Sequence, residues 1–176
     1  MTPLEELFAD PWFPFTGDIR VKDLEPPVIP EPARSDESPD DCSVCQRKAE
    51  DFVWADESWA LQAFRHSPFP GIVLLVPRTH YDSYADLPEA LLAQVGPMTA
   101  RVERAVLSIG TAARVHVCRL GDGGGHLHLW FMPRPLGAMQ LRGSMFPMWF
   151  DLLEPLPAAE IDAALATIAA AMRAGD

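Results

Sequence analysis

The sequence predicts an α+β fold in which helices pack on a largely antiparallel sheet. Two observations lead to this prediction: short apolar runs joined by turns follow one another closely, and a long segment of helical periodicity is inserted between them. The chain has 176 residues, of which 48% are apolar. That length and composition are sufficient for one domain with a substantial core.

Five short apolar segments are expected to form strands. The first two are joined by a turn at Glu57-Ser58, and the third is a continuous apolar run of the length typical of a buried strand. In chain order they are Phe52–Asp56, Trp59–Phe64, Gly71–Pro77, Arg114–Leu120 and His126–Met132.

Two helices are expected around these strands. Apolar residues recur every three or four positions from Leu87 to Ile109, which is typical of a helix with one face against a core. Gly96-Pro97 stands in the middle of this segment and predicts a kink or a split into two helices, because proline removes a backbone N–H. The alanine-rich segment from Ala158 to Arg173 predicts a closing helix.

The first 41 residues predict an appended arm, and residues 42–176 the folded domain. A proline-rich stretch at 26–32 and an acidic stretch at 35–41 are typical of an extended, solvated linker. Ahead of them lies a dense apolar group: Leu4, Leu7, Phe8, Trp12, Phe13 and Phe15. Aromatic side chains this dense are rarely left in water. We therefore expect the arm to dock on the main body or on a partner subunit.

Charge and cysteine content limit the classes of partner. The formal net charge of −11 repels a nucleic acid polymer but permits a small phosphorylated ligand held by a few donors in a pocket. No apolar run reaches the roughly 18–20 residues that a membrane helix needs, and the N-terminus lacks the features of a signal peptide. We therefore expect no membrane association, a cytoplasmic location, and three cysteines that do not form disulfides.

The most informative segment runs from Gly121 to Arg134, where a glycine-rich stretch leads into an alternating apolar strand. Residues two apart on a strand point to the same face, so His126 and His128 should line one surface, with Trp130 after them. Two neighbouring histidines at a glycine-rich turn are poor core residues. Their presence indicates chemistry or a metal site.

The cysteines suggest which of the two applies to His126. Cys42 and Cys45 have the spacing of half a tetrahedral zinc site, and His80 and His126 stand at strand ends where they can complete it. A redox-active cysteine pair and a coincidental spacing are the alternatives. Cys118 is isolated within a strand and is expected to be a small buried apolar residue.

His126-Leu-His128-Leu-Trp130-Phe-Met-Pro-Arg134 resembles the signature of the histidine triad (HIT) superfamily, His-φ-His-φ-His-φ-φ, where φ is apolar. Val76-Pro-Arg-Thr-His80 resembles the Ile-Pro-Lys-x-His segment of the same superfamily, and Cys42 and Cys45 match its zinc-containing branch. The resemblance covers residues 42–135 in order and spacing. It implies a HIT-like fold, with a mainly antiparallel five- to six-stranded sheet, one long kinked helix and a C-terminal helix.

The resemblance also implies roles for individual residues. Cys42, Cys45, His80 and His126 would hold a structural Zn²⁺. His128 would be the nucleophile that attacks a phosphorus and forms a phosphohistidine intermediate, since a neutral imidazole carries a free lone pair. The substrate phosphate would be met by the loop residues Gly123, Gly124 and Gly125 and by Arg134. HIT domains commonly form homodimers, so a homodimer is expected.

Two departures from the HIT pattern concern the substrate. Trp130 replaces the third histidine, and an indole N–H can donate a hydrogen bond but cannot shuttle a proton. Arg65 stands where an acidic residue usually binds the ribose, so it would meet a phosphate or a carboxylate instead. Two functions remain open: a phosphohydrolase or nucleotidyl transferase acting on a nucleotide or other small phosphorylated substrate, and a noncatalytic HIT-like nucleotide- or phosphate-binding protein.

Overall fold

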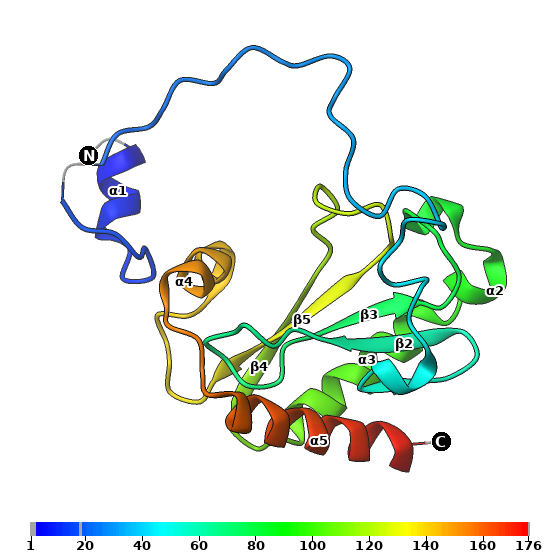
Figure 1. Cartoon of the computed structure of the whole chain (residues 1–176). Coiled ribbons are helices and arrows are strands. Elements are labelled where there is room, and N and C mark those ends of the chain that lie inside the picture. Colours follow the sequence, from blue (N-terminus) through cyan, green and yellow to red (C-terminus); the bar gives the residue numbers. More distant parts are fainter. Residues whose placement is uncertain (1–2, 18, 176) are drawn as a thin grey trace.

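A five-stranded antiparallel sheet forms the centre of the protein (Figure 1). The computed structural model describes residues 3–17 and 19–175. Each strand pairs antiparallel with its neighbours, in the order β1-β2-β3-β5-β4. The strands are β1 (Trp54–Ala55), β2 (Trp59–Ala63), β3 (Val73–Pro77), β4 (Ala112–Cys118) and β5 (Leu129–Pro135). The predicted α+β class and antiparallel sheet are confirmed.

The last strand of the chain, β5, lies between β3 and β4. Leu74 of β3 lies opposite Trp130, and Cys118 of β4 lies opposite the same residue on the other side. Since β3 and β5 are antiparallel neighbours, the end of β3 is brought beside the beginning of β5. Residues just outside these two strand ends therefore meet in space.

Two helices, α3 (Val95–Leu107) and α5 (Ala158–Ala174), cover one face of the sheet. Figure 1 shows both helices on the same side of the strands. Their apolar residues pack against alternate residues of the central strands and form the main core: Trp59, Leu61, Val73, Leu75, Met98, Val102, Val106, Leu129, Phe131, Ile161, Leu165, Ile168 and Met172. The predicted periodicities of these segments correspond to their buried faces.

The segment expected to form one kinked helix is split into α2 (Glu89–Leu92) and α3. The split precedes Gly96-Pro97, so Pro97 lies in the first turn of α3. The first N–H groups of a helix have no partner within the helix, and a proline there removes nothing that the helix needs. The predicted interruption is confirmed, and it falls slightly earlier than the proline.

The opposite face of the sheet is covered in part by α4 (Phe146–Leu152), which the sequence pattern did not predict. Phe146 is fully buried and stacks on Phe69, with ring centroids 5.0 Å apart. The remaining helices are short: α1 (Pro3–Ala9) and the 3-10 turns η1 (Ala49–Asp51), η2 (Tyr84–Asp86) and η3 (Gly143–Met145). None of the helices in the described part of the chain is long and apolar enough to cross a membrane.

The N-terminal arm contacts α4. The Nε1–H of Trp149 donates to the carbonyl oxygen of Trp12 at 2.7 Å, and the guanidinium carbon of Arg142 lies 3.6 Å from the centroid of a Trp12 ring. Between the arm and the domain, residues 19–33 form an extended and largely exposed arch (Figure 1). Trp12 is thus docked on the main body; the side chains of Leu4 and Phe8 lie outside the described residues. The boundary at Cys42 stays a prediction.

Candidate metal centre and phosphate site

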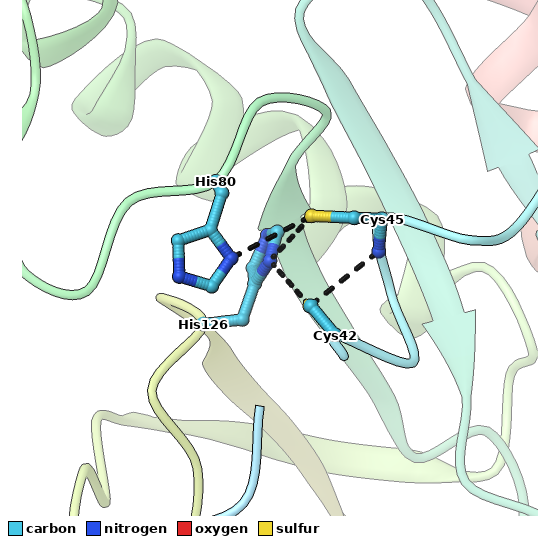
Figure 2. Close-up of side chains that lie close together, drawn as sticks. All are labelled: Cys42, Cys45, His80 and His126. Atoms are coloured by element: carbon cyan, nitrogen blue, oxygen red, sulfur yellow. Dashed lines mark hydrogen bonds between the residues drawn. The ribbon is translucent and has the colours of Figure 1, made fainter. Parts of the chain in front are cut away.

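Four potential metal ligands meet where β3 ends and β5 begins (Figure 2). His80 follows β3, and His126 precedes β5. Cys42 and Cys45 stand on a tight turn ahead of β1 and face the two imidazoles. The antiparallel pairing of β3 with β5 thus brings together ligands that are far apart in the sequence.

The distances within this cluster suit a tetrahedral metal ion. The Nδ1 atom of His126 lies 3.3 Å from the sulfur of Cys42 and 3.6 Å from that of Cys45. The Nδ1 atom of His80 lies 3.5 Å from the Cys45 sulfur, and all four ligand atoms lie within 4.8 Å of one another. A tetrahedral Zn²⁺ with ordinary Zn–S and Zn–N bonds separates its ligand atoms by about 3.3–3.8 Å.

Hydrogen bonding fixes the tautomer of His126 in a form that can bind a metal. Its Nε2 lies 2.9 Å from the carbonyl oxygen of Pro77, which can only accept, so Nε2 carries the proton and Nδ1 keeps the lone pair. Burial lowers the pKa of His126, which keeps the imidazole neutral. The lone pair therefore points towards the two sulfurs.

The Cys45 thiol beside Cys42 loses its proton with difficulty unless a metal cation binds the sulfur. Burial, and then the neighbouring Cys42 sulfur, raise the pKa of Cys45 to about 11. A divalent ion removes this penalty, because thiolates and imidazoles are the preferred ligands of zinc. Two sulfurs and two imidazole nitrogens leave no open position, as in structural zinc sites. The predicted set of Cys42, Cys45, His80 and His126 fits a structural Zn²⁺.

His128 lies beside this cluster and is oriented by it. Its Nδ1 donates to the carbonyl oxygen of His126 at 2.8 Å, so the lone pair of the neutral ring is on Nε2. The imidazole lies in the wall of a pocket of about 380 Å³. The other residues lining this pocket are Ser35, Asp36, Ser43, Val44, Gln62, Leu74, Val76, Leu120, Gly123, Gly124, His126 and Trp130.

One wall of the pocket comes from a segment that the sequence pattern assigned to a solvated linker. Ser35 forms an isolated parallel bridge with Gly124, and the Gly125 N–H donates to the Ser35 carbonyl oxygen at 2.7 Å. The hydroxyl of Ser35 donates to the Gly123 carbonyl at 2.8 Å. We call residues Arg34–Glu37 the strap, since they hold the glycine loop against the body of the protein.

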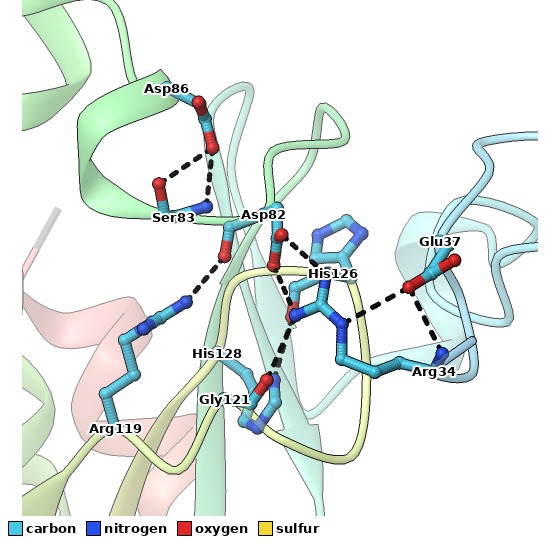
Figure 3. A network of polar contacts seen from close by, with 9 residues as sticks. All are labelled: Arg34, Glu37, Asp82, Ser83, Asp86, Arg119, Gly121, His126 and His128. Atoms are coloured by element: carbon cyan, nitrogen blue, oxygen red, sulfur yellow. Dashed lines mark hydrogen bonds and ion pairs between the residues drawn. The ribbon is translucent and has the colours of Figure 1, made fainter. Parts of the chain in front are cut away.

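Arg34 anchors the strap (Figure 3). Its guanidinium makes two hydrogen bonds to the carboxylate of Asp82, at 2.6 and 3.0 Å, and a third to the carbonyl oxygen of Gly121 at 3.1 Å. This pairing lowers the pKa of Asp82. Because Asp82 closely follows His80, the same loop supplies a metal ligand and the anchor of the strap.

Solved structures with the same arrangement of elements identify the fold. A Zn-bound histidine triad family protein from Mycobacterium smegmatis has a TM-score of 0.59 and 18% identity, covering 79% of this chain and 100% of that one. A histidine triad protein from Bradyrhizobium japonicum has a TM-score of 0.56 and 23% identity, covering 70% and 92%. A hypothetical histidine triad nucleotide-binding protein from Sulfolobus tokodaii has a TM-score of 0.56 and 16% identity, covering 76% and 93%.

The chain has the HIT fold. No protein-family model matches its sequence, and a sequence search of curated proteins finds no match. The fold expected from the motif is thus confirmed by structural similarity alone.

Within this HIT fold, the predicted substrate-binding residues of the glycine loop and of β5 near His128 divide into two groups. Gly123, Gly124 and Trp130 line the pocket beside His128. Gly125 is instead committed to the strap, since its N–H is bound to Ser35. Gly125 is therefore a structural residue of the loop and offers no N–H to a ligand.

The two predicted arginines are not brought to this pocket. Arg65 is exposed and pairs with the carboxylate of Asp162 on α5, where it lines a different hollow of about 620 Å³. Arg134 directs its guanidinium at the carbonyl oxygens of Pro135, the last residue of β5, and of Ala138 in the following turn. The position of Arg65 depends on a contact with a residue distant in sequence, and that of Arg134 on the conformation of the loop after β5. Neither can be predicted from a local sequence pattern.

Trp130 stands at the position of the third histidine of the HIT motif, and its indole N–H makes no hydrogen bond to the described residues. The ring lines the pocket and packs on Phe64, with ring centroids 5.2 Å apart. Its Nε1 is buried and has no hydrogen-bond partner among the described residues. The indole N–H is therefore shielded from solvent, and its donation to a ligand stays a prediction.

Substitution of Gly125 tests the strap. A Cβ at this position would lie 2.8 Å from the Cα of Glu37, whereas a Cβ at Gly123 would meet nothing within 4 Å. We expect Gly125→Ala to lower the free energy of unfolding by about 1–3 kcal/mol, and the matched Gly123→Ala by less than about 0.5 kcal/mol. Urea unfolding of both variants measures this. Equal effects would show that the strap does not pack on the loop.

Substitution of Cys42 tests the metal centre. Purified protein should contain about one zinc per chain, and Cys42→Ser should lose it together with roughly 10 °C or more of thermal stability. Cys118→Ser is the control, since Cys118 lies on β4 outside the cluster. Elemental analysis and thermal unfolding provide the readouts. Wild-type protein that contains no zinc, or that keeps its melting temperature after chelation, would contradict the assignment.

Proposed function

We propose that this protein is a phosphohydrolase or nucleotidyl transferase with a structural zinc, acting on a nucleotide or another small phosphorylated ligand through His128. The observation that carries the proposal is the hydrogen bond from His128 Nδ1 to the His126 carbonyl. It leaves Nε2 as the atom with the lone pair, on an imidazole that lines the pocket. A histidine so placed is an oriented nucleophile.

The proposed reaction has two steps. In the first, the lone pair of His128 Nε2 attacks phosphorus, and the bond from phosphorus to the leaving group breaks. The positive charge on the ring is stabilised by the His126 carbonyl oxygen at Nδ1. In the second, water or a second acceptor attacks the phosphohistidine, and the electron pair of the P–N bond returns to Nε2. The backbone at Gly123 and Gly124, which line the pocket, is available to the phosphate oxygens.

Zinc is proposed to be structural, since Cys42, Cys45, His80 and His126 would occupy all four of its positions. By holding His126 in place it would keep the carbonyl that orients His128 in place. The name of the similar Mycobacterium smegmatis protein, a Zn-bound one, supports this assignment. The name of the Sulfolobus tokodaii protein, a nucleotide-binding one, supports the class of ligand. Zinc thiolates and the free thiol of Cys118 suit the reducing cytoplasm, which we propose as the location.

A noncatalytic nucleotide- or phosphate-binding protein is the second candidate. The observation in its favour is Trp130, which stands where a proton donor is expected and whose N–H is buried. A binder does not require an oriented nucleophile, however, and the tautomer of His128 is specified by a hydrogen bond of 2.8 Å. We therefore place the enzyme first.

Replacement of His128 separates the two candidates. With an activated phosphate ester of a nucleotide, denaturing quench of the wild type should trap an acid-labile adduct on His128. His128→Ala should lower turnover by about 10³-fold or more while retaining zinc. His66→Ala is the control, because His66 is exposed and does not line the pocket. Mass spectrometry and elemental analysis are the measurements. An adduct that persists in His128→Ala, or a change in ligand affinity alone, would refute the enzymatic proposal.

A homodimer is proposed as the assembly. Strand β4 lies at an edge of the sheet, where its outer backbone groups are available to a second sheet, and Leu136 and Met139 beyond β5 are 63% and 54% exposed. Multi-angle light scattering at micromolar concentration should give twice the mass of one chain. A monomer at that concentration would exclude the dimer.

A further inference from the structure

Building on the function proposed above, we infer that the pocket selects substrates with one negatively charged phosphoryl group and a leaving group that departs as a stable anion. An acyl phosphate anhydride, which releases a carboxylate, and an aryl phosphate ester, which releases a phenolate, have this chemistry. Asp36 sets the limit on charge, and Trp130 sets the requirement on the leaving group. Neither residue belongs to the proposed nucleophile or metal site.

The described residues of the pocket lining carry a fixed negative charge and no fixed positive one. None of the described residues that line it is a lysine or an arginine, and the only carboxylate among them is that of Asp36. Its Oδ1 accepts the Ser43 N–H at 2.6 Å, which lowers the pKa of Asp36 and keeps it ionised. A Cβ on Gly124 would lie 3.7 Å from the other carboxylate oxygen, so the charge stands beside the glycine loop.

The arginines in and near the strap, Arg34 and Arg119, already have hydrogen-bond partners within the protein. Arg34 is bound to the carboxylates of Asp82 and Glu37 and to the Gly121 carbonyl. Arg119 donates to the Asp82 carbonyl oxygen at 2.9 Å. Arg34 lines a separate hollow behind the loop, together with Glu37. Additional phosphate groups on a ligand would therefore meet Asp36 without a compensating side chain, which should weaken productive binding by about tenfold per extra charge.

Among the described residues that line the pocket, none is an acid that can protonate a leaving group. The Trp130 N–H is buried and is too weak an acid to transfer its proton, and the hydrogen bond from the Ser43 N–H, which lowers the pKa of Asp36, keeps that carboxyl ionised. The Nε2–H of His126 is bound to Pro77. The remaining polar side chains in the described lining, Ser35, Ser43 and Gln62, are not acids at neutral pH. An amine or alkoxide, which must be protonated as it departs, would leave slowly.

The first chemical step that fits these constraints needs no proton donor. The Nε2 lone pair of His128 forms a bond to phosphorus, and the oxygen of the leaving group takes the electron pair of the P–O bond and departs as a carboxylate or phenolate. Water then cleaves the P–N bond, giving the phosphate product and one proton to solvent. The Nδ1 proton stays on its hydrogen bond to the His126 carbonyl throughout.

A series of aryl esters of adenosine 5'-monophosphate tests the leaving-group requirement on the zinc-loaded full chain. As the pKa of the phenol rises, kcat/KM of the wild type should fall steeply. In Trp130→His, which restores an acid, the decline should be shallower, with a gain of about tenfold or more for the poorest leaving groups. Trp130→Phe, which removes only the N–H, should keep the steep decline. A shallow decline in the wild type, or equal slopes in the wild type and Trp130→His, would overturn the inference.

The charge limit is tested by comparing the 4-nitrophenyl ester with a dinucleoside triphosphate. The wild type should prefer the ester, and Asp36→Asn should reduce this preference by about tenfold. Asparagine is a suitable substitute, because it accepts the Ser43 N–H and tolerates the positive φ of 55° at this residue. Glu37→Gln is the matched control, since Glu37 is adjacent but outside the pocket. A wild-type preference for the triphosphate, or equal effects of the two variants, would overturn the charge limit.

These results are distinguishable from failure of the proposed function. If no ester in the series leaves an adduct on His128, the proposed enzyme is wrong, and this inference fails with it. If the adduct forms but the triphosphate is preferred or the leaving-group dependence is shallow, the enzyme stands and the inference alone is wrong.

Discussion

The site depends on three hydrogen-bonding and metal-binding groups of one residue, His126. Its Nε2 donates to the Pro77 carbonyl at the end of β3, and its Nδ1 faces the sulfurs of Cys42 and Cys45. Its carbonyl oxygen accepts the Nδ1–H of His128. A buried imidazole with both nitrogens committed has one available orientation. That orientation places the carbonyl, and the carbonyl determines which nitrogen of His128 carries the lone pair.

The strap links this centre to the ligand pocket. Arg34 binds Asp82 near the metal ligand His80, and Ser35 pairs with the glycine loop on the other side. The strap is thus bound on one side to the loop that follows β3 and on the other side to the loop that precedes β5. The strap also places Asp36 in the pocket wall, so the segment that stabilises the loop contributes a carboxylate to the pocket.

Much of this arrangement could be predicted from local sequence. The strands and the helices α3 and α5 have clear periodicity, and Cys42, Cys45, His80 and His126 were identifiable because ligand type and position at strand ends are local properties. The strap could not be predicted, since a proline-rich and acidic composition is typical of solvated chain, and its bonds join residues distant in sequence. The location of Arg65 depends in the same way on α5, through Asp162.

We propose that the metal centre determines the tautomer of His128 through the His126 carbonyl. Long-range ¹⁵N–¹H correlation spectra of histidine side chains measure this directly. In zinc-loaded protein, the proton of the neutral His128 ring is expected on Nδ1, and chelation of zinc is expected to give a mixture of the two neutral tautomers. A proton on Nε2 with zinc bound, or a spectrum of His128 unchanged by removing zinc, would show that the metal centre does not determine the tautomer.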